Sequence, residues 1–410
     1  MLFQHTFFGA GYKPIFVKDI DCTKDTPVDL GWEEKPVYGK SIRINPRVPG
    51  REDTEHFRDI FLPELLPLEE YDLIAVLFSG GKDSVACFYK LIELGVPKEK
   101  IEIWHHDIDG GHPLRHMDWR CTQNYVRSFA EAEGVPLRIS YRKNGFFGEL
   151  YRLGASERIC WEDPDTGEVF TCQPSKKQLE SERIKEHALD DMEEELKKLG
   201  CRMKFPAKAA DLSTRWCSAY LKIAVADSVI SNLEETRREK RILIVSGERR
   251  GESTGRSKYN EMELHRTNAP SRSMRIVHQW RPVIDYSEKD VWEVLKRHRV
   301  NPHPAYRCGW NRCSCAMCIF SQPHHFAGIK ELYPEEYAAL VEDEKTLNFT
   351  IDNTKDLDTY VGCAKSCVYH GDKEALHSLI TGKYTVDDVY VKGEWMYPAG
   401  AFHGAEGGPC

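Results

Sequence analysis

Short apolar runs alternate with stretches of helical periodicity through the middle of the chain. The helical stretches place apolar residues three and four positions apart, as in Val85, Phe88 and Ile92. The apolar runs have the length of buried strands, and they span residues 73–78, 101–105, 137–141 and 241–245. This alternation is typical of a parallel sheet covered by helices. The sequence therefore predicts an α/β fold with a doubly wound, mostly parallel sheet.

The alternation is absent at both ends of the chain and in one internal stretch. Prolines recur through residues 1–70, where we expect an irregular extension with one helix near Thr54 to Leu62. Residues 155–210 predict a loop or small hairpin and then one charged amphipathic helix, which together indicate a helical insertion. Its charged residues are typical of a solvated face.

Beyond the insertion, the pattern predicts a last strand and several helices. The strand is expected from Arg281, and Ser287 with Asp290 forms a capping box that opens the next helix. Further elements follow towards the C-terminus, namely helices over 331–344 and 373–381 and a strand over 384–391. Residues 301–410 thus form a mostly helical region.

Composition describes an ordinary globular protein. The 410 residues are 41% hydrophobic and 30% charged, with a formal net charge of -8, which argues against non-specific coating of nucleic acid. No apolar run has the length of a membrane span, and the first residues lack a signal-peptide pattern, so we expect a cytoplasmic protein. Fourteen cysteines in a reducing compartment point to metal binding or catalysis before disulfides.

A glycine turn joins the first predicted strand to the first predicted helix. It contains Ser79, Gly80, Gly81, Lys82, Asp83 and Ser84. Adjacent glycines allow a tight turn with outward N–H groups, and the helix behind them favours an anion. Lys82 would add a full positive charge, and the Ser84 hydroxyl would cap the helix or contact a phosphate oxygen. We therefore predict a phosphate-binding loop, with residues 71–300 as the nucleotide-binding domain.

Two further turns follow predicted strands and so lie at the same edge of the sheet. Asp107 follows the second strand, either as a contact to ribose or magnesium or as one of several solvated acids in a turn. A glycine- and arginine-bearing turn follows the strand 241–245, and its guanidinium groups suit phosphate or sulfate. Its candidate ligand-binding residues are Gly247, Arg249, Glu252, Ser253 and Arg256.

A cluster of four cysteines lies in residues 308–318, hereafter the cysteine segment. Cys315 and Cys318 have the spacing with which two thiolates hold one metal or cluster. Cys308 and Cys313 complete a local four-thiolate site, or a distant cysteine replaces one of them. The spacing favours a 4Fe-4S cluster over zinc, because zinc ribbons show two well-separated Cys-x-x-Cys pairs.

Together, the glycine turn and the cysteine segment resemble the phosphoadenosine phosphosulfate (PAPS) reductase family, within the PP-loop N-type ATP pyrophosphatases. The turn after strand 241–245 resembles the family's Gly-x-Arg-x-x-Glu-Ser element. The resemblance implies that Arg215 and Lys222 contact an anion and that Cys217 is a cluster ligand. The sulfonucleotide reductases of this family use a cysteine near the C-terminus that is followed by a histidine. Cys410 would be the corresponding residue, but it is a poor match because no histidine follows it.

The resemblance implies an enzyme that uses ATP or PAPS with magnesium and a 4Fe-4S cluster. We expect an ATP-dependent sulfurtransferase akin to those that modify DNA, in which Lys82, Ser84 and Arg249 act in catalysis on a nucleotide bound by both turns. The acceptor is then possibly a nucleic acid, and the sulfur comes from a donor protein. The alternatives are a PAPS or adenylyl-sulfate reductase regenerated by thioredoxin and a non-catalytic nucleotide-binding module.

Overall fold

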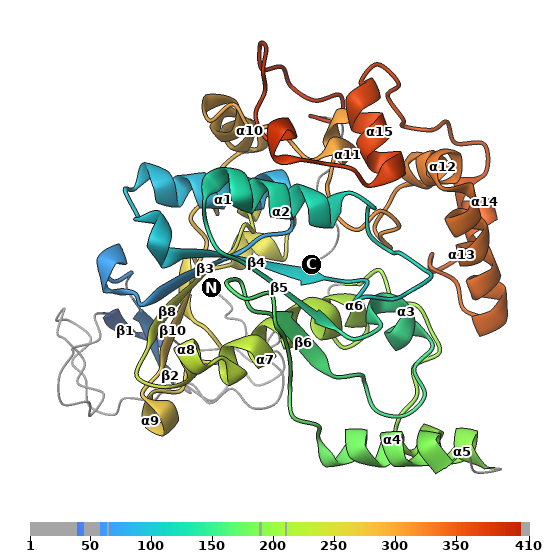
Figure 1. Ribbon diagram of the computed structural model, residues 1–410, viewed down its shortest axis with the longest axis horizontal. Coiled ribbons are helices and arrows are strands. Elements are labelled where there is room, and N and C mark those ends of the chain that lie inside the picture. Colours follow the sequence, from blue (N-terminus) through green and yellow to red (C-terminus); the bar gives the residue numbers. More distant parts are fainter. Residues whose placement is uncertain (1–38, 45–57, 64, 188–190, 210, 403–410) are drawn as a thin grey trace, which may run out of the picture.

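The computed structural model describes residues 39–44, 58–63, 65–187, 191–209 and 211–402. Its centre is an eight-stranded sheet with the order β7-β6-β5-β4-β3-β8-β10-β9 (Figure 1). The strands are β3 (Leu73–Leu77), β4 (Ile101–Asp107), β5 (Leu137–Arg142), β6 (Ile159–Glu162), β7 (Val169–Thr171), β8 (Arg241–Val245), β9 (Met262–Leu264) and β10 (Ile276–Trp280). The five strands from β5 to β10 in this order pair in parallel, and β6, β7 and β9 add antiparallel edges. The predicted doubly wound, mostly parallel fold is confirmed.

Helices cover both faces of this sheet. Alternate side chains of a strand point to opposite faces, so Ile74 and Val76 of β3 face one core while Ala75 faces the other. The first core is closed by three helices, α1 (Lys82–Glu93), α2 (Thr122–Glu133) and α10 (Glu288–Arg297). Helix α7 (Ala224–Asn232) closes the second core (Figure 1). Because the five central strands run parallel, their carboxyl ends lie at one shared edge of the sheet.

A second group of helices packs beside the sheet around its own apolar core. It contains α11 (Pro304–Arg307), α12 (Pro323–Leu332), α13 (Pro334–Leu347), α14 (Leu357–Val361) and α15 (Lys373–Thr381), with α3 (Gly145–Leu150) from the sheet side. The predicted helix over 373–381 is confirmed, and α13 covers most of the predicted helix over 331–344. Figure 1 shows these C-terminal helices gathered at one end of the molecule.

The insertion extends the sheet instead of standing apart from it. Strands β6 and β7 form the expected hairpin, and β6 pairs with β5. The structure has two helices after the hairpin, α4 (Lys176–His187) and α5 (Met192–Leu199), so the expectation of a single helix is wrong. Each buries one apolar residue deeply, Ile184 and Leu196. The remaining short helices are α6 (Trp216–Ser218), α8 (Glu234–Arg237) and α9 (Pro270–Ser273).

Three predicted elements differ from the structure. The last parallel strand is β10, which ends before Arg281, since Pro282 has no N–H for a strand ladder. The apolar pattern missed β10 because the strand contains polar residues. They are buried with partners: His278 hydrogen-bonds to the Tyr71 hydroxyl at 2.8 Å, and Gln279 donates to Ser246. The helical capping box at Ser287 is confirmed.

The other two differences lie near the ends of the chain. Instead of a helix near Thr54 to Leu62, the described residues there form strand β2 (Arg58–Pro63), which pairs with β1 (Gly39–Ile44). Instead of a strand over 384–391, the chain makes a short 3-10 turn at Val386–Asp388. The Asp388 carboxylate accepts from the backbone and hydroxyl of Thr385, and such local bonds compete with a strand ladder.

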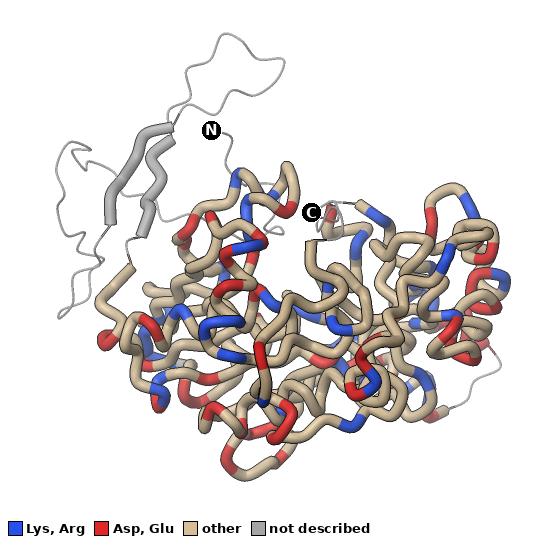
Figure 2. The backbone as a smooth tube through the Cα atoms, turned by 90° about the horizontal axis from the view of Figure 1, so that it is seen from above, with Lys and Arg blue, Asp and Glu red and all other residues tan. Residues whose placement is uncertain are grey.

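Charges of both signs are distributed over the described backbone. Figure 2 shows Lys and Arg interspersed with Asp and Glu, without a continuous basic face. No helix in the described part of the chain has both the length and the apolar character that crossing a bilayer requires. The division into residues 1–70, 71–300 and 301–410 stays a prediction.

Trp292 of α10 joins the sheet core to α11, and its removal tests this packing. Its ring is fully buried and meets Tyr306 edge to face at 5.1 Å. We expect Trp292→Ala to lower the free energy of unfolding by about 3–5 kcal/mol, because the vacated volume cannot collapse completely. Met396→Ala is the control, since Met396 is 76% exposed, and it should change stability by less than about 0.5 kcal/mol. Equal effects in urea denaturation would contradict this role of Trp292.

Candidate functional site

A cavity of about 450 Å³ opens at the carboxyl ends of the parallel strands. Its walls come from β3, β4, β9 and β10, from the turn after β8, from the helical segment at 215–226 and from the cysteine segment. This volume is within the range of small-molecule sites, and the strand-end position is where α/β sheets bind ligands. The predicted residues that line it are Ser79, Gly81, Asp83, Ser84, Arg215, Lys222, Gly247, Glu252, Arg256, Cys313 and Cys315.

Loop 79–84 forms the floor of this cavity where β3 passes into α1. Gly80 has a φ of +80°, which favours glycine, and an added Cβ would lie 3.2 Å from the Tyr125 ring. The Ser84 hydroxyl donates to the Gly81 carbonyl at 2.8 Å, and the Lys82 N–H donates to the Tyr306 hydroxyl at 3.3 Å. The amino end of the 12-residue helix α1 is thereby fixed at the cavity.

Lys82 and Asp83 have different positions from those expected of phosphate contacts. The Lys82 ammonium lies 3.7 Å from the Asp83 carboxylate and 5.4 Å from the Tyr306 ring centre, and its side chain is buried. Lys82 does not line the cavity. Arg249 Nε donates to the other Asp83 oxygen at 2.6 Å, so Arg249 is also buried behind the loop. The two predicted catalytic cations therefore lie beneath loop 79–84.

The turn after β8, loop 246–256, packs directly against loop 79–84. A Cβ on Gly247 would lie 3.0 Å from the Asp83 carbonyl carbon, so a side chain there would require the Asp83 backbone to shift. Glu252 accepts from the Arg249 N–H at 2.8 Å and pairs with the Arg256 guanidinium. Ser253 accepts from the Arg256 N–H and lies outside the cavity lining. Loop 246–256 thus presents Gly247, Glu252 and Arg256 to the cavity.

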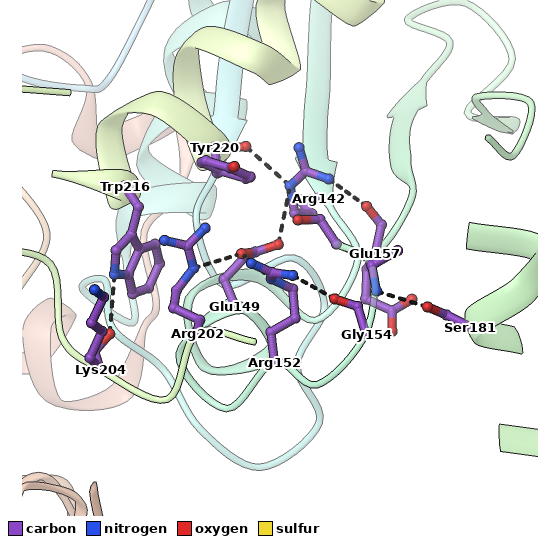
Figure 3. A network of polar contacts seen from close by, with 12 residues as sticks. Arg142, Glu149, Arg152, Gly154, Glu157, Ser181, Arg202, Lys204, Trp216 and Tyr220 are labelled. Atoms are coloured by element: carbon purple, nitrogen blue, oxygen red, sulfur yellow. Dashed lines mark hydrogen bonds and ion pairs between the residues drawn. The ribbon is translucent and has the colours of Figure 1, made fainter. Parts of the chain in front are cut away.

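The helical segment before α7 presents one face to the cavity and the other to a polar network. Arg215, Ser218 and Lys222 line the cavity, and their spacing of three and four places them on one helical face. A π-helical turn over Ala219–Ile223 interrupts the regular helix here, which is frequent at functional sites. Trp216 and Tyr220 lie on the other side, towards the network in Figure 3.

The network is organised around the buried carboxylate of Glu149. Arg152 and Arg202 each donate to it at 3.1 Å. The Arg202 guanidinium also lies 4.7 Å from the Trp216 ring centre and 4.5 Å from that of Tyr220 (Figure 3). The insertion therefore holds the segment that carries Arg215, Cys217 and Lys222.

The five cysteines predicted as metal ligands do not all lie together in the structure. The thiols of Cys217, Cys315 and Cys318 are electrostatic neighbours, and Cys313 is a neighbour of Cys315. Burial raises the pKa of Cys217 to about 11 and that of Cys315 well above its ordinary value. The Cys308 thiol instead neighbours Cys121 and Cys367. Cys217, Cys315 and Cys318 thus interact with one another, Cys313 interacts with Cys315 and with Cys121, and Cys308 interacts with Cys121 and Cys367.

No group among the described residues has the spacing to hold a single metal ion. A 4Fe-4S cluster needs its four thiolates further apart than a single ion does, because each thiolate binds its own iron atom. Buried thiols with raised pKa values keep their protons, and metal binding would replace those protons. The residues present are therefore compatible with a four-thiolate cluster at Cys217, Cys313, Cys315 and Cys318.

At the end of β4, the cavity is lined by His105 and His106 and not by the predicted Asp107. The Asp107 carboxylate accepts from the Asp109 N–H at 2.8 Å and so stabilises its own turn. Burial lowers the pKa of His105 to about 4 and that of His106 to about 3, so both imidazoles are neutral at pH 7. The sheet there offers hydrogen-bonding groups without charge.

Sequence reasoning missed several residues of the cavity lining, among them His105, His106, Asp118, Glu248, Glu263, His265, Arg266, Gln279, Arg281 and Arg312. Arg281 directly follows a parallel strand and Arg312 lies inside the cysteine segment, so position along the chain was an available signal for both. Asp118 follows no strand and belongs to no motif. Burial raises its pKa to about 7.

Comparison with known proteins identifies one domain. Residues 176–321 match the family model of the phosphoadenosine phosphosulfate reductase domain. This range contains Arg215, Lys222, loop 246–256 and the cysteine segment, whereas loop 79–84 precedes it. The domain and the mostly parallel α/β sheet support a nucleotide-using enzyme.

The relatives found are themselves uncharacterised. A 37.8 kDa protein of Escherichia phage 186 is 29% identical over 279 residues, which cover 66% of this chain and 74% of that protein. A protein of Methanocaldococcus jannaschii is 27% identical over 138 residues, or 34% of this chain and 31% of that protein. Among solved structures, Candida glabrata FMN adenylyltransferase is 12% identical with a TM-score of 0.28, too low to support a shared fold. This match covers 61% of this chain and 54% of that one.

The contact between the two loops is testable at Gly247. We expect Gly247→Ala to displace loop 79–84, because the new methyl group meets the Asp83 backbone. Affinity for ATP should fall about tenfold, equivalent to about 1.4 kcal/mol, as measured by calorimetry. Gly251→Ala is the matched control, since an added Cβ there meets no atom within 4 Å. A loss of the same size in the control would refute the assignment.

Proposed function

Since this chain carries a phosphoadenosine phosphosulfate reductase domain over residues 176–321, we propose that it is an ATP-dependent sulfurtransferase of this family. One observation supports the proposal above the others: loop 79–84 and the cysteine segment face the same cavity. A Cβ on Gly81 would lie 3.4 Å from the Cys313 carbonyl oxygen, so the two segments are in contact. A nucleotide held by the loop would therefore lie next to the cysteines.

In the proposed reaction, an acceptor oxygen forms a bond to the α-phosphorus of ATP while the bond to the β-phosphate breaks. Pyrophosphate leaves, and a sulfur nucleophile from a donor then displaces AMP from the acceptor. The amino end of α1 and Ser84 face the leaving pyrophosphate, and magnesium carried by the phosphates would neutralise part of its charge. Lys82 and Arg249 lie behind the loop and both pair with the Asp83 carboxylate. Their two positive charges exceed its single negative charge.

A 4Fe-4S cluster at Cys217, Cys313, Cys315 and Cys318 would supply a site for binding the transferred sulfur. Zinc is the alternative, and the spacing of the cysteines favours the cluster over it. The residues of this chain have two roles around those thiols: the Glu149 network fixes the segment of Cys217, and Lys222 places a positive charge beside Cys315.

The second candidate function is a PAPS or adenylyl-sulfate reductase, which the domain description itself favours. Such a reaction needs a thiolate that attacks the sulfur of the nucleotide. The cavity thiol of Cys315 has a pKa well above its ordinary value, which makes it a poor nucleophile near neutral pH. The other candidate nucleophile, Cys410, lies outside the described residues.

Nucleotide selectivity distinguishes the two functions. We expect anaerobically purified protein to bind ATP with magnesium at least tenfold more tightly than PAPS or adenylyl sulfate, by calorimetry. Pyrophosphate release from ATP with a candidate acceptor would then be measured. Selective binding of a sulfonucleotide, with sulfite release, would instead establish the reductase, and binding of ATP without turnover on any acceptor would favour a non-catalytic module.

The ligand assignment is testable through metal content. We expect Cys315→Ser to lose most of the iron and the visible absorbance of anaerobically prepared protein, because Cys315 neighbours Cys217 and Cys318. Cys308→Ser is the matched control from the same segment, and it should retain iron, since its thiol lies towards Cys121 and Cys367. Equal loss in both variants would contradict the assignment, as would zinc in place of iron.

A further inference from the structure

A second cavity, of about 290 Å³, lies between the hairpin of β6 and β7 and the helices α4 and α7. None of the described residues lines both this cavity and the one at the strand ends. Its volume is just below the range typical of small-molecule sites, so it suits a ligand of a few heavy atoms. The polar residues of its lining are Arg142, Arg158, Gln173, Gln178, Ser228 and Asn232.

Arg142, at the end of β5, is the deeply buried cation of this second cavity, with 7% of its surface exposed. Its Nε donates to the Tyr220 carbonyl at 3.2 Å, and its Nη1 donates to the Glu157 carbonyl at 2.5 Å (Figure 3). Its Nη2 donates to no described residue and is accessible to solvent. The two carbonyls therefore fix the guanidinium plane and leave Nη2 available to a ligand.

The carboxylate nearest to Arg142 is shared with two other arginines. Glu149 lies 3.9 Å from the Arg142 Nε, and it accepts from Arg152 and Arg202 at 3.1 Å each. None of the three arginines has another carboxylate at ion-pair distance in the described part of the chain. Burial lowers the pKa of Arg142, and a bound anion would offset this unfavourable burial of its charge.

The other polar groups of the lining add donors and no negative charge. Arg158 uses Nε and Nη2 for one oxygen of Glu182, at 3.0 and 2.6 Å, which leaves its Nη1 without a partner among the described residues. The Ser228 hydroxyl and the Gln173 amide likewise bind no other described side chain or backbone group. The described lining contains neither Asp nor Glu, so it would not repel an anion.

We propose that this second cavity binds a small oxyanion, which is a carboxylate or phosphate group on a ligand of a few heavy atoms. Arg142 and Arg158 would be its cationic donors, and Ser228 and Gln173 would donate to its remaining oxygens. Because the Arg142 guanidinium is already held by two carbonyls, little ordering is needed on binding. The site is independent of the proposed function, since it shares none of the described residues of the nucleotide cavity.

The test titrates the full chain with inorganic phosphate and, separately, with malonate, by calorimetry. We expect at least one of the two anions to bind with a dissociation constant below about 1 mM, and Arg142→Gln and Arg158→Gln each to weaken it about tenfold. Arg183→Gln is the matched control, because Arg183 is exposed on α4, pairs with Glu180 and does not line the cavity. It should leave the affinity unchanged.

Arg158→Gln decides the test alone if Arg142→Gln does not fold, because the Arg158 side chain is only partly buried. Unchanged affinity in the folded pocket variants overturns the proposal, as does binding of both anions weaker than about 1 mM. Arg312→Gln locates the bound anion, since Arg312 lines only the nucleotide cavity. Binding that this variant weakens and the pocket variants do not would also overturn the proposal.

The two titrations also identify the class of ligand. Tighter binding of phosphate that depends on Arg158 supports the site and assigns it to a phosphate-bearing ligand. Tighter binding of malonate with the same dependence supports the site and assigns it to a carboxylate. Failure of the wild type to bind ATP would refute the proposed function and leave both titrations valid.

Discussion

The ion pair between Asp83 and Arg249 holds the two strand-end loops together, and the cavity depends on it. Arg249 is almost fully buried, and the Asp83 carboxylate at 2.6 Å stabilises its charge there. The pair lies under the point where Gly247 meets the Asp83 backbone. Loop 79–84 and loop 246–256 therefore form one rigid unit, although more than 160 residues separate them in the sequence.

The C-terminal region completes this unit from the other side. Tyr306 accepts from the Lys82 N–H and meets Trp292 of α10, so α11 contacts both the loop and a helix of the sheet core. Gly400 packs so closely that a Cβ there would lie 2.0 Å from the Trp310 carbonyl oxygen. These contacts fix the cysteine segment relative to loop 79–84.

Patterns of apolar residues predicted the architecture because β3 and β8 are nearly continuous apolar runs, and because β5 alternates Leu137, Ile139 and Tyr141 with polar residues. The pattern failed at β10, where His278 and Gln279 are polar but have partners inside the core. The motifs predicted which segments line the cavity, since eleven predicted residues line it.

The motifs did not predict the direction in which the individual side chains point. Lys82 points towards Trp292 and Tyr306, and Asp107 turns back onto its own loop, both through contacts with residues distant or irregular in sequence. The position of Arg312 in the cysteine segment was a signal, but its shared contact with Phe320 and Arg215 forms only in the folded chain.

The distribution of charge divides the cavity into two halves with different chemistry. On the side of β4 and β10, His105 and His106 are neutral because burial lowers the pKa of each, and Arg281 is compensated by Glu263. Neutral hydrogen-bonding groups and compensated charges suit an uncharged nucleoside. On the cysteine side, Lys222 and Arg312 add positive charge without an ion-pair partner among the described residues. Because loop 79–84 contacts the cysteine segment at Gly81 and Cys313, a nucleotide whose phosphates rest on the loop would have the thiols close by.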